Sequence, residues 1–417
     1  MRDVRMRGFA ERADVEEVDR FLREHSSALE AEEVDLLECT GRVLAEDVQA
    51  DLHVPGFARA AMDGYAVRGE DTFGASAYDP IALRLIGQAL PGEVFDGVVE
   101  PGTAVRIMTG APLPKGADAV LMAEVCDERE GSVELTEPVA PRKNVGAVGE
   151  DIRAGDVVLR VGRRLRPQDA GLLASIGIAR PRCVRRPRVQ LVITGDELLP
   201  AGARPEGVRI VDSNSVVLRG LVARDGGELL PFEILPDDAE RVREVLSSDR
   251  ADLVLVSGAS SVGTEDHAPR LVAELGSLDF HGISMRPSSP AGVGRVRERW
   301  VFLLPGNPVS CLCAYEFFAG PTLRALGGRS RAWPHRRVRL PLARKISSAV
   351  GRTDYVRVAI EDAAVAPLGI SGASILSSTV RAAGCVIVPR ELEGMPEGAE
   401  VEVRLYDEAP EPEGSGA

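Results

Sequence analysis

The chain is poor in aromatic side chains and has no excess of positive charge. Phe, Trp and Tyr make up 4% of its 417 residues, and 64 Asp and Glu outnumber 50 Lys and Arg, which gives a formal net charge of −14. Proteins that bind nucleic acid without sequence preference attract phosphates with basic grooves and stack bases on aromatic rings. We therefore expect no binding to nucleic acid or to an anionic membrane surface. Local charge decides whether a small anion binds.

Long apolar runs and cysteine pairs are also missing. No uninterrupted apolar run approaches the roughly 18 residues of a membrane-spanning helix, and Met1–Arg5 lacks the apolar core of a signal peptide. The six cysteines include no Cys-x-x-Cys pair and match no zinc or disulfide spacing. Cys311 and Cys313 lie in an apolar stretch, where buried reduced thiols are the simplest interpretation. These absences favour a cytoplasmic protein without a membrane segment.

A chain of 417 residues is too long for one compact core, so we expect several domains. Between Pro55 and Val145 short apolar runs alternate with Gly and Pro, which is typical of a small β domain inserted into the chain. The expected segments are an N-terminal helix and linker (14–54), the inserted β domain (55–145), the second part of a linker domain (146–186), an α/β domain (187–330), a C-terminal β domain (331–406) and a disordered tail (407–417).

The segment 187–330 alternates strands and helices. Apolar runs predict strands at 189–193, 229–235, 253–256 and 300–304, followed by helices that end near residues 222, 246, 275 and 318. Strand, loop and helix in repetition predict a parallel sheet that is covered on both faces. The fold class is therefore multidomain α/β, with β-rich domains before and after the parallel-sheet domain.

Three loops that follow strands of this sheet are rich in small or polar residues. In parallel sheets ligands bind at the carboxyl ends of the strands, so we expect Thr194–Glu197, Ser257–Asp266 and Pro305–Ser310 to form one site. The small residues of Ser257–Gly263 would let backbone N–H groups approach an anion near the start of the next helix. No Gly-Lys-Ser/Thr follows, so this loop is not a Walker A motif. The alternative is a tight strand-to-helix turn without a ligand.

The acidic residues of this edge, Asp196, Glu197 and Asp266, favour a divalent cation. Clustered carboxylates beside a phosphate would repel it unless a cation such as Mg²⁺ lies between them. Each carboxylate alone is more often a helix cap or a solvated side chain, and Asp266 directly precedes a helix. Asp237 and Asp238 also open a helix, and for these two we prefer capping.

Short motifs that place a polar residue beside Gly or Pro occur along the whole chain. They are Met62-Asp63-Gly64-Tyr65-Ala66, Ile107-Met108-Thr109-Gly110-Ala111-Pro112, Ile193-Thr194-Gly195-Asp196-Glu197-Leu198 and Leu304-Pro305-Gly306-Asn307-Pro308-Val309-Ser310. Such stretches pack poorly but shape the backbone, which suits loops that hold a ligand. In this order they closely resemble the molybdopterin molybdenumtransferases, the family of bacterial MoeA and gephyrin. The resemblance runs from Val15 to Val403.

The resemblance implies a fold and an activity. The fold would combine a molybdopterin-binding α/β domain of the MogA type with an inserted β-rich domain, a linker domain and a C-terminal domain similar to a β-barrel. The activity would be the insertion of molybdate into adenylylated molybdopterin with release of AMP, with Mg²⁺ as cofactor. The expected partners are a second copy of the chain, in a homodimer whose active site is shared between subunits, and the molybdopterin adenylyltransferase.

The resemblance also implies roles for individual residues. Asp63 and Thr109 would come from the inserted domain of one subunit and face the sheet domain of its partner. Together with Glu197 and Asp266, the two expected metal ligands, they are the expected catalytic residues. The expected substrate-binding residues are Asp151, Thr194, Gly195, Asp196, Ser257, Gly258, Ser261, Gly263, Pro305, Gly306, Asn307 and Pro308. The expected molybdate ligands are Arg286, Ser310, Arg352 and Ser374.

Three departures from the family motifs concern anion binding. The family has Lys-Pro-Gly-Lys-Pro where this chain has Arg286-Pro287-Ser288-Ser289-Pro290, so one lysine becomes arginine and the other becomes Ser289. Ala259 replaces a glycine, and Gly146–Val148 replaces a run that contains arginines. An isolated arginine is also more often part of a surface salt bridge. The alternative function is a diverged paralogue that binds a pterin or nucleotide, or acts as a scaffold, without molybdate transfer. An unrelated nucleotide or sugar-phosphate enzyme on a similar sheet is a third possibility.

Overall fold

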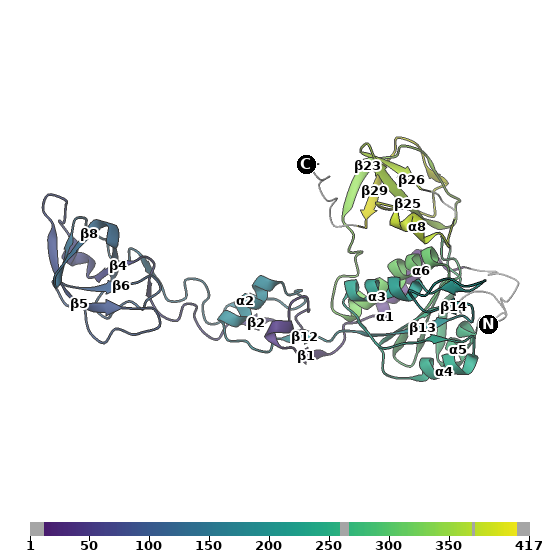
Figure 1. The fold of residues 1–417 in the computed structure, drawn as a ribbon, viewed down its shortest axis with the longest axis horizontal. Helices are drawn as coiled ribbons and strands as arrows, with labels where there is room; N and C mark the ends of the chain where they lie inside the picture. Colours follow the sequence, from purple (N-terminus) through teal and green to yellow (C-terminus); the bar gives the residue numbers. More distant parts are fainter. Residues whose placement is uncertain (1–11, 259–266, 369–371, 407–417) are drawn as a thin grey trace. The chain divides into compact units, whose positions relative to one another are not determined.

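A computed structural model describes residues 12–258, 267–368 and 372–406 (Figure 1). The chain forms two compact units, one of residues 33–40 and 44–182 and the other of residues 1–32, 41–43 and 183–417. Each unit is described by itself. Three residues assigned to the site from the sequence lie outside the described residues, namely Ser261, Gly263 and Asp266. The helices within the described ranges are too short or too polar to cross a membrane.

The first unit contains a six-stranded sheet with the order β7-β4-β6-β5-β9-β8. Its strands are β4 (Gly64–Val67), β5 (Ile81–Ala89), β6 (Thr103–Ile107), β7 (Ala119–Met122), β8 (Cys126–Arg129) and β9 (Ser132–Leu135). Side chains of β4 alternate between two cores: Tyr65 and Val67 pack with Leu83, whereas Ala66 packs with Val105. Both faces of the sheet are therefore covered at β4, and the short apolar runs of this segment do form strands.

Short elements lead into and out of this sheet. They are β2 (Val48–Gln49), β3 (Arg59–Ala60), β10 (Val145–Gly146), β11 (Val157–Leu159), η1 (Leu36–Glu38), η2 (Gly69–Thr72), η3 (Ala123–Val125) and helix α2 (Pro167–Ser175). Because β3 pairs with β10 and β2 pairs with β11, the chain enters and leaves along antiparallel strands. Helix α2 begins at Pro167, as expected, and the Asp169 carboxylate accepts a hydrogen bond from the Arg166 backbone N–H at 2.9 Å. In the sequence, β1 (Ala31–Glu33) and β12 (Arg182–Val184) lie where the chain passes from one unit to the other.

The second unit contains a seven-stranded sheet. Its strands are β13 (Arg188–Thr194), β16 (Glu228–Leu229), β17 (Ile234–Leu235), β18 (Leu253–Ser257), β19 (Ser277–His281), β21 (Gly292–Val296) and β22 (Arg299–Leu304). The order is β16-β13-β18-β22-β21-β19, with β17 also paired to β13. The strands from β16 to β22 are parallel, as predicted, but β21 and β19 are antiparallel. The two residues between β21 and β22 allow only a hairpin, because a parallel connection needs a long crossover.

Helices cover both faces of this sheet (Figure 1). Helices α1 (Val15–His25), α3 (Asn214–Asp225), α6 (Pro308–Ala314) and α7 (Gly320–Leu326) pack on one face, and α4 (Ala239–Ser247) and α5 (Ala268–Leu275) pack on the other. In β18, Leu253 and Leu255 face the first group, whereas Val254 and Val256 face the second. The continuous apolar run of β18 follows from this burial on both sides.

Two predicted elements of this domain differ from the structure. The single strand expected at 229–235 is split into β16 and β17, since Pro231 has no N–H to give to the ladder. The helix expected to end at 318 continues through a π-helical segment, η4 (Tyr315–Ala319), into α7. The capping prediction for α4 is confirmed for Asp238, whose Oδ1 accepts a hydrogen bond from the Glu240 backbone N–H at 2.8 Å. The side chain of Asp237 accepts instead from the Asp196 N–H at 3.3 Å.

A second sheet of this unit contains the C-terminal strands and one strand from the α/β segment. Its strands are β20 (Met285–Arg286), β23 (Arg337–Pro341), β25 (Thr353–Glu361), β26 (Ala364–Pro367), β27 (Gly384–Val388) and β29 (Glu400–Leu405). A bridge between Leu342 and Val365 joins the end of β23 to β26, so the sheet closes on itself. The remaining elements are β14 (Leu198–Leu199), β15 (Ile210–Val211), β24 (Ile346–Ser347), β28 (Gly394–Met395) and α8 (Leu376–Val380).

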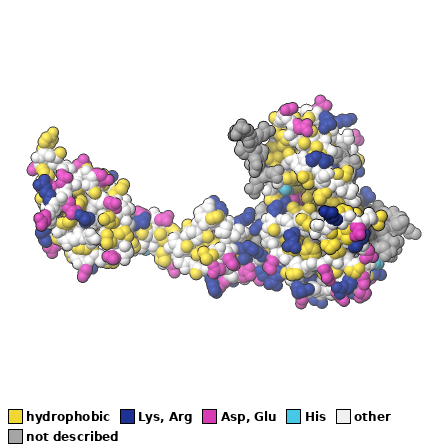
Figure 2. Space-filling view, in the orientation of Figure 1, with side chains coloured by type: hydrophobic (Ala, Val, Ile, Leu, Met, Phe, Trp, Pro, Cys, Tyr) yellow, Lys and Arg dark blue, Asp and Glu magenta, His cyan; other side chains and the backbone are white. Residues whose placement is uncertain are grey.

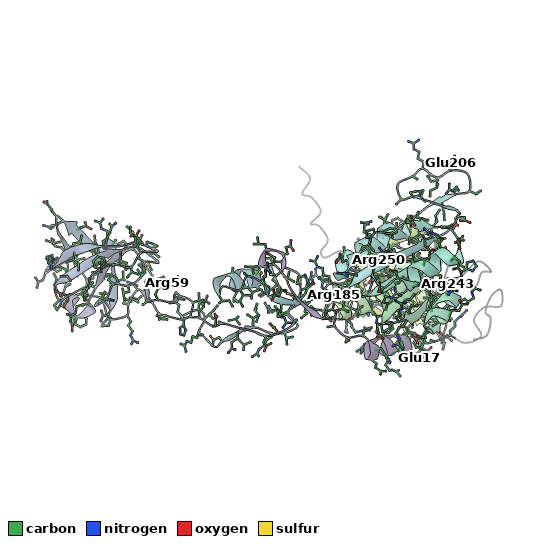
Figure 3. The ribbon with its side chains drawn as sticks, turned by 90° about the horizontal axis from the view of Figure 1, so that it is seen from below. Glu17, Arg59, Arg185, Glu206, Arg243 and Arg250 are labelled. Atoms are coloured by element: carbon green, nitrogen blue, oxygen red, sulfur yellow. The ribbon has the colours of Figure 1, made fainter. Side chains whose placement is uncertain are left out.

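Two surface features of the second unit are visible in the figures. On the face shown in Figure 2, basic and acidic side chains are interspersed over the α/β domain. A loop between β14 and β15 projects from the domain, with Glu206 at its outer end (Figure 3).

Cys311 and Cys313 are buried, as predicted, and burial raises the pKa of the Cys311 thiol to about 12.

Candidate functional site

The carboxyl ends of three parallel strands border a cavity of about 540 Å³, here named the strand-end pocket. Thr194 ends β13, Ser257 ends β18, and Gly306 follows β22. The pocket is lined by Ile193, Thr194, Glu197, Leu198, Ile210, Val211, Asp212, Ser213, Asn214, Ser257, Gly258, Gly306, Asn307, Pro308 and Ser374. Described parts of all three loops grouped from the sequence therefore meet in one cavity. Neighbouring parallel strands produce this arrangement because their carboxyl ends lie at the same edge.

Two of the strand-end loops pass very close to one another. Gly258 has a φ of +118°, and a Cβ atom at this position would lie 2.3 Å from the carbonyl oxygen of Thr194. Position 258 therefore requires glycine for two reasons: its backbone conformation and the close approach of the Thr194 loop. Gly195 also contacts a neighbour, since its N–H donates to the Leu235 carbonyl at 3.3 Å. The backbone of the β18 loop thus packs directly on that of the β13 loop at the edge of the pocket.

Asn214 is the residue that connects the loops, and the sequence analysis missed it. Its Nδ2 donates to Ser257 Oγ at 2.9 Å and to the Gly306 carbonyl at 2.8 Å. Asn214 Oδ1 and Thr194 Oγ1 are buried and have no hydrogen-bond partner among the described residues. Buried polar atoms are normally paired, so both atoms are available to a bound group. The available signal was the polar run Asp212-Ser213-Asn214 at the start of α3.

The Pro305–Pro308 loop forms another side of the pocket. Pro305 is buried at the end of β22, and Gly306 supplies the carbonyl that Asn214 holds. Asn307 precedes α6, and Pro308 occupies the first turn of this helix. Asn307 makes no side-chain cap, so its amide is free of that role. Proline favours this position because the first helical N–H has no partner within the helix.

The acidic residues of this edge have different surroundings. Glu197 is exposed and lines the pocket. Asp212 is buried, and its Oδ1 accepts a hydrogen bond from the Ser215 N–H at 3.0 Å, so it caps α3. Asp196 does not line the pocket; its Oδ1 accepts from the Asp237 N–H at 3.4 Å, and Asp237 Oδ2 accepts from the Asp196 N–H at 3.3 Å. Asp196 therefore holds the loop that follows β13 against the residues that precede α4.

A metal site is not formed by the described residues alone. In the described ranges, no group of three or more His, Cys, Asp and Glu is arranged to hold a metal ion. Of the two expected ligands Glu197 lines the pocket, and Asp266 lies outside the described residues. The donors present are oxygens, including the unpartnered Thr194 Oγ1 and Asn214 Oδ1. Oxygen donors of this kind suit Mg²⁺ better than a softer metal.

Two of the expected molybdate ligands converge on one carboxylate. Asp354 is 0% exposed and forms close ion pairs with Arg286 and, at 3.0 Å, with Arg352 Nε. Ser348 Oγ also donates to Asp354 Oδ2 at 2.8 Å. Burial lowers the pKa of Arg286, and Asp354 opposes this effect. The salt-bridge interpretation of these arginines is thus correct, yet two guanidinium groups and one carboxylate leave one net positive charge.

The start of α6 contacts both the strand-end pocket and the loop that follows Arg286. The Val309 N–H donates to the Ala373 carbonyl at 3.0 Å, which ties the loop of Ser374 to α6. Ser374 itself lines the pocket. Ser310 is buried, and its carbonyl accepts a hydrogen bond from Ser288 Oγ. The start of α6 therefore contains Ser310, contacts the loop of Ser374 and contacts the loop that follows Arg286, and Arg352 is linked to Arg286 through Asp354.

In the other unit, Asp63 and Thr109 lie together. Asp63 Oδ1 accepts hydrogen bonds from the Thr109 backbone N–H and from Thr109 Oγ1, both at 2.7 Å. These hydrogen bonds lower the pKa of Asp63, which is exposed. Gly64 has a structural role, since a Cβ atom there would lie 1.9 Å from the Leu121 carbonyl oxygen. The two motifs therefore form one surface turn that presents an oriented carboxylate.

Asp151 lies in a turn of the same unit. Its N–H donates to the Val54 carbonyl at 3.1 Å. The neighbouring Glu150 makes the side-chain contacts of this motif: its Oε1 lies 2.9 Å from the Nη2 of Arg59, at the edge of the β domain (Figure 3), and its Oε2 accepts from the Ala147 N–H at 3.1 Å. Glu150 was not predicted from the sequence, where only Asp151 was assigned in the run Gly149-Glu150-Asp151.

Models of known protein families match most of the chain. The description "MoeA N-terminal region (domain I and II)" matches residues 13–177, "Probable molybdopterin binding domain" matches 190–325, and "MoeA C-terminal region (domain IV)" matches 339–406. The chain belongs to the MoeA family. The resemblance seen in the short motifs is confirmed, and so is the MoeA-like combination of an α/β domain with β-rich domains.

Similar MoeA-family proteins span nearly the whole chain. The chain is 36% identical over 409 residues to a molybdopterin biosynthesis protein of Methanocaldococcus jannaschii, covering 95% of this chain and 96% of that protein. It is 32% identical over 389 residues to the molybdopterin molybdenumtransferase of Haemophilus influenzae, covering 91% and 94%. Two crystal structures of the Pyrococcus horikoshii molybdopterin biosynthesis MoeA protein have TM-scores of 0.82 and 0.77, at 32% and 33% identity, and each match covers 95% of this chain and 100% of the other.

Proposed function

We propose that this MoeA-family chain is a molybdopterin molybdenumtransferase, which inserts molybdate into adenylylated molybdopterin and releases AMP. The observation that carries the proposal is that α6 joins two features: its Pro308 lines the strand-end pocket, and its Ser310 carbonyl accepts a hydrogen bond from Ser288, two residues after Arg286 of the positively charged cluster. A pocket lined by apolar side chains with a few polar and acidic groups suits an extended ligand, and guanidinium groups suit a small oxyanion. The family comparisons support this function and give no support to the scaffold alternative.

In this proposal the strand-end pocket holds the adenylylated molybdopterin. Gly258 and Gly306 let the backbone approach the ligand, and Thr194 and Asn214 offer buried polar atoms to it. Arg286 and Arg352, with Ser310 and Ser374 nearby, bind molybdate beside it. Such a site accelerates the reaction mainly by holding the two substrates in contact and by stabilising charge as it develops.

Mg²⁺ is the proposed cofactor, held by Glu197 and Asp266. When bound, it would neutralise phosphate charge near the exposed Glu197 carboxylate. The chain itself supplies the oxygen donors and positions them with the strand-end loops. A metal titration of wild-type protein and of Glu197→Gln tests this assignment: we expect weaker Mg²⁺ binding by the variant, and equal affinities would contradict it.

Asp63 is the proposed acidic residue from the inserted domain. Thr109 orients it with two hydrogen bonds from neutral groups, so the carboxylate stays ionised at neutral pH. A carboxylate in this state accepts hydrogen bonds or attracts a cation and does not act as a proton donor. We propose that it serves the site of a partner subunit in a homodimer. The proposal extends to a cytoplasmic location and to substrate supply by the molybdopterin adenylyltransferase.

The deciding experiment measures AMP release by the purified protein with adenylylated molybdopterin, Mg²⁺ and increasing molybdate. We expect AMP release that depends on molybdate, together with metal retained on the pterin. Tight binding of the substrate without AMP release at any molybdate or tungstate concentration would reject the transferase.

Mixing two inactive variants tests whether the site is shared between subunits. In a homodimer with shared sites, one mixed dimer of Asp63→Ala and Glu197→Ala subunits contains one site without either substitution. We therefore expect the mixture to recover activity that neither variant has alone. A mixture that stays inactive after subunit exchange would place both residues in sites formed within one subunit.

A further inference from the structure

The two arginines assigned to molybdate share a single buried anchor. Arg286 lies in β20 and Arg352 directly precedes β25, and the parallel pairing of these strands places Arg286 opposite Asp354. Asp354 is 0% exposed, whereas the side chains of Arg286 and Arg352 are 32% and 34% exposed. Both arginine side chains are therefore partly exposed to solvent, although their Nε atoms are buried, and the carboxylate is inaccessible.

The contacts of the Asp354 carboxylate restrict its movement. Ser348 Oγ donates to Asp354 Oδ2 at 2.8 Å, on the same oxygen that contacts Arg286. The other oxygen, Oδ1, lies 3.0 Å from Arg352 Nε. Oδ2 is thus held by hydrogen bonds and Oδ1 by an ion pair without a hydrogen bond, and the strand pairing fixes the backbone that carries them. Arginine is a long side chain with many rotamers, so a fixed carboxylate limits where each guanidinium lies.

We propose that Asp354 is a positioning residue for the oxyanion, which acts by holding Arg286 and Arg352 in place. This inference rests on the proposed function, because it concerns the site where molybdate binds. It differs from the roles assigned from the sequence, which concern groups that touch the anion. Asp354 itself does not touch the anion.

Positioning and simple charge balance predict opposite results when the carboxylate is removed. In Asp354→Asn the net charge of the cluster rises from one to two, so a role in charge balance alone predicts tighter binding of an anion. Positioning predicts weaker binding, because the guanidinium groups lose the ion pairs that orient them. The direction of the change in KM for molybdate therefore separates the two.

The experiment measures AMP release with sodium molybdate varied at saturating adenylylated molybdopterin, and then with the two exchanged. For Asp354→Asn we expect the KM for molybdate to rise by about tenfold or more, the effect of losing one charge-assisted hydrogen bond. The KM for adenylylated molybdopterin should stay nearly unchanged. Ser348→Ala is the matched control: it removes a neutral hydrogen bond to Asp354 but keeps both ion pairs, so its molybdate KM should change much less.

Asp354→Glu protects the test against misfolding of the first variant. It keeps the charge and displaces the carboxylate by one methylene, so positioning again predicts a higher molybdate KM, and charge balance predicts no change. A molybdate KM that is unchanged or lower in these variants, or two KM values that rise together, would overturn the inference while leaving the proposed function intact. A wild-type protein without molybdate-dependent AMP release would overturn both.

Discussion

Asp63 and Asp354 belong to different units, and each is held in a different way. Asp63 is exposed in a turn of the β domain and accepts two hydrogen bonds from Thr109. Asp354 is buried, and Arg286 and Arg352 form ion pairs with it. Both carboxylates are well oriented. Neutral donors leave the negative charge of Asp63 available to a ligand, whereas the arginines cancel the charge of Asp354.

The comparison separates two uses of a carboxylate. One oriented by neutral donors can act on a substrate or cation, and one surrounded by cations acts on the protein by fixing those cations. Glu316, in the π-helical segment η4, is another carboxylate that is paired with a cation of the protein. It is 3% exposed, and its Oε1 lies 2.6 Å from Arg224 Nη1 and 3.3 Å from His335 Nε2.

The largest expected effect is the loss of stability in Glu316→Gln. Arg224 pairs with both Glu316 and Asp225, and His335 also contacts Glu316, so the substitution removes one member of a buried network of charges. We expect a loss of about 3 kcal/mol. Both tryptophans, Trp300 and Trp333, lie in the unit that contains Glu316, so their fluorescence in urea reports on this unit. An unchanged unfolding midpoint would show that Glu316 does not stabilise the fold through its charge.

Glu316 also predicts a pH dependence of similar size. Burial alone would raise its pKa, but the contacts with His335 and Arg224 lower it from 4.5 to about 2. A carboxyl group with a lowered pKa in the folded state stabilises the protein above the unfolded pKa and loses that effect as pH falls through the folded pKa. We expect about 3 kcal/mol of stability to disappear between pH 4.5 and 2 in the wild type. The loss should be much smaller in Glu316→Gln, and equal pH profiles would refute the assignment.

Asp63→Asn tests the first class. An Asn Oδ1 can still accept both hydrogen bonds from Thr109, so the turn should persist while the charge is lost. We expect a loss of about 100-fold in kcat/KM, the size typical of an acidic or electrostatic catalytic group. The melting temperature should hardly change, because the side chain is exposed. Thr109→Ser, which keeps the hydroxyl, is the control; full activity in Asp63→Asn would mean that orientation, and not charge, is what the site needs.

The smallest expected effect is that of replacing Asn214, whose amide connects the loops of the strand-end pocket. Asn214→Ala removes the hydrogen bonds to Ser257 and Gly306, and we expect the KM for adenylylated molybdopterin to rise by about tenfold. Molybdate KM should change less. Gln190→Ala is the matched control, because this amide also bonds a carbonyl, that of Leu191 at 3.0 Å, but does not line the pocket. Equal effects of the two variants would argue against a specific role for Asn214.

Much of the local structure could be predicted from local patterns. The apolar run of β18 indicated a strand buried on both faces, and Asp238 before α4 indicated a cap. The position of the pocket could also be predicted from the sequence, since parallel strands bring their carboxyl ends to one edge of the sheet. One strand prediction was wrong, because Pro231 splits the segment 229–235 into two strands. The antiparallel edge was not predicted, because no strand was predicted for β21 and its direction follows from the two-residue connection to β22.

The sequence by itself determined the family, the order of strands and helices, and the loops at the strand ends, because hydrophobic period, caps and glycine positions act over a few residues. Only the tertiary structure decided which side chains meet. Asp354 pairs with Arg286 across 68 residues, Asp63 with Thr109 across 46, and Asn214 with Gly306 across 92. Such contacts depend on how distant strands are aligned, and no local pattern specifies that alignment. For this reason a carboxylate that acts on a ligand and one that fixes two arginines look alike in the sequence.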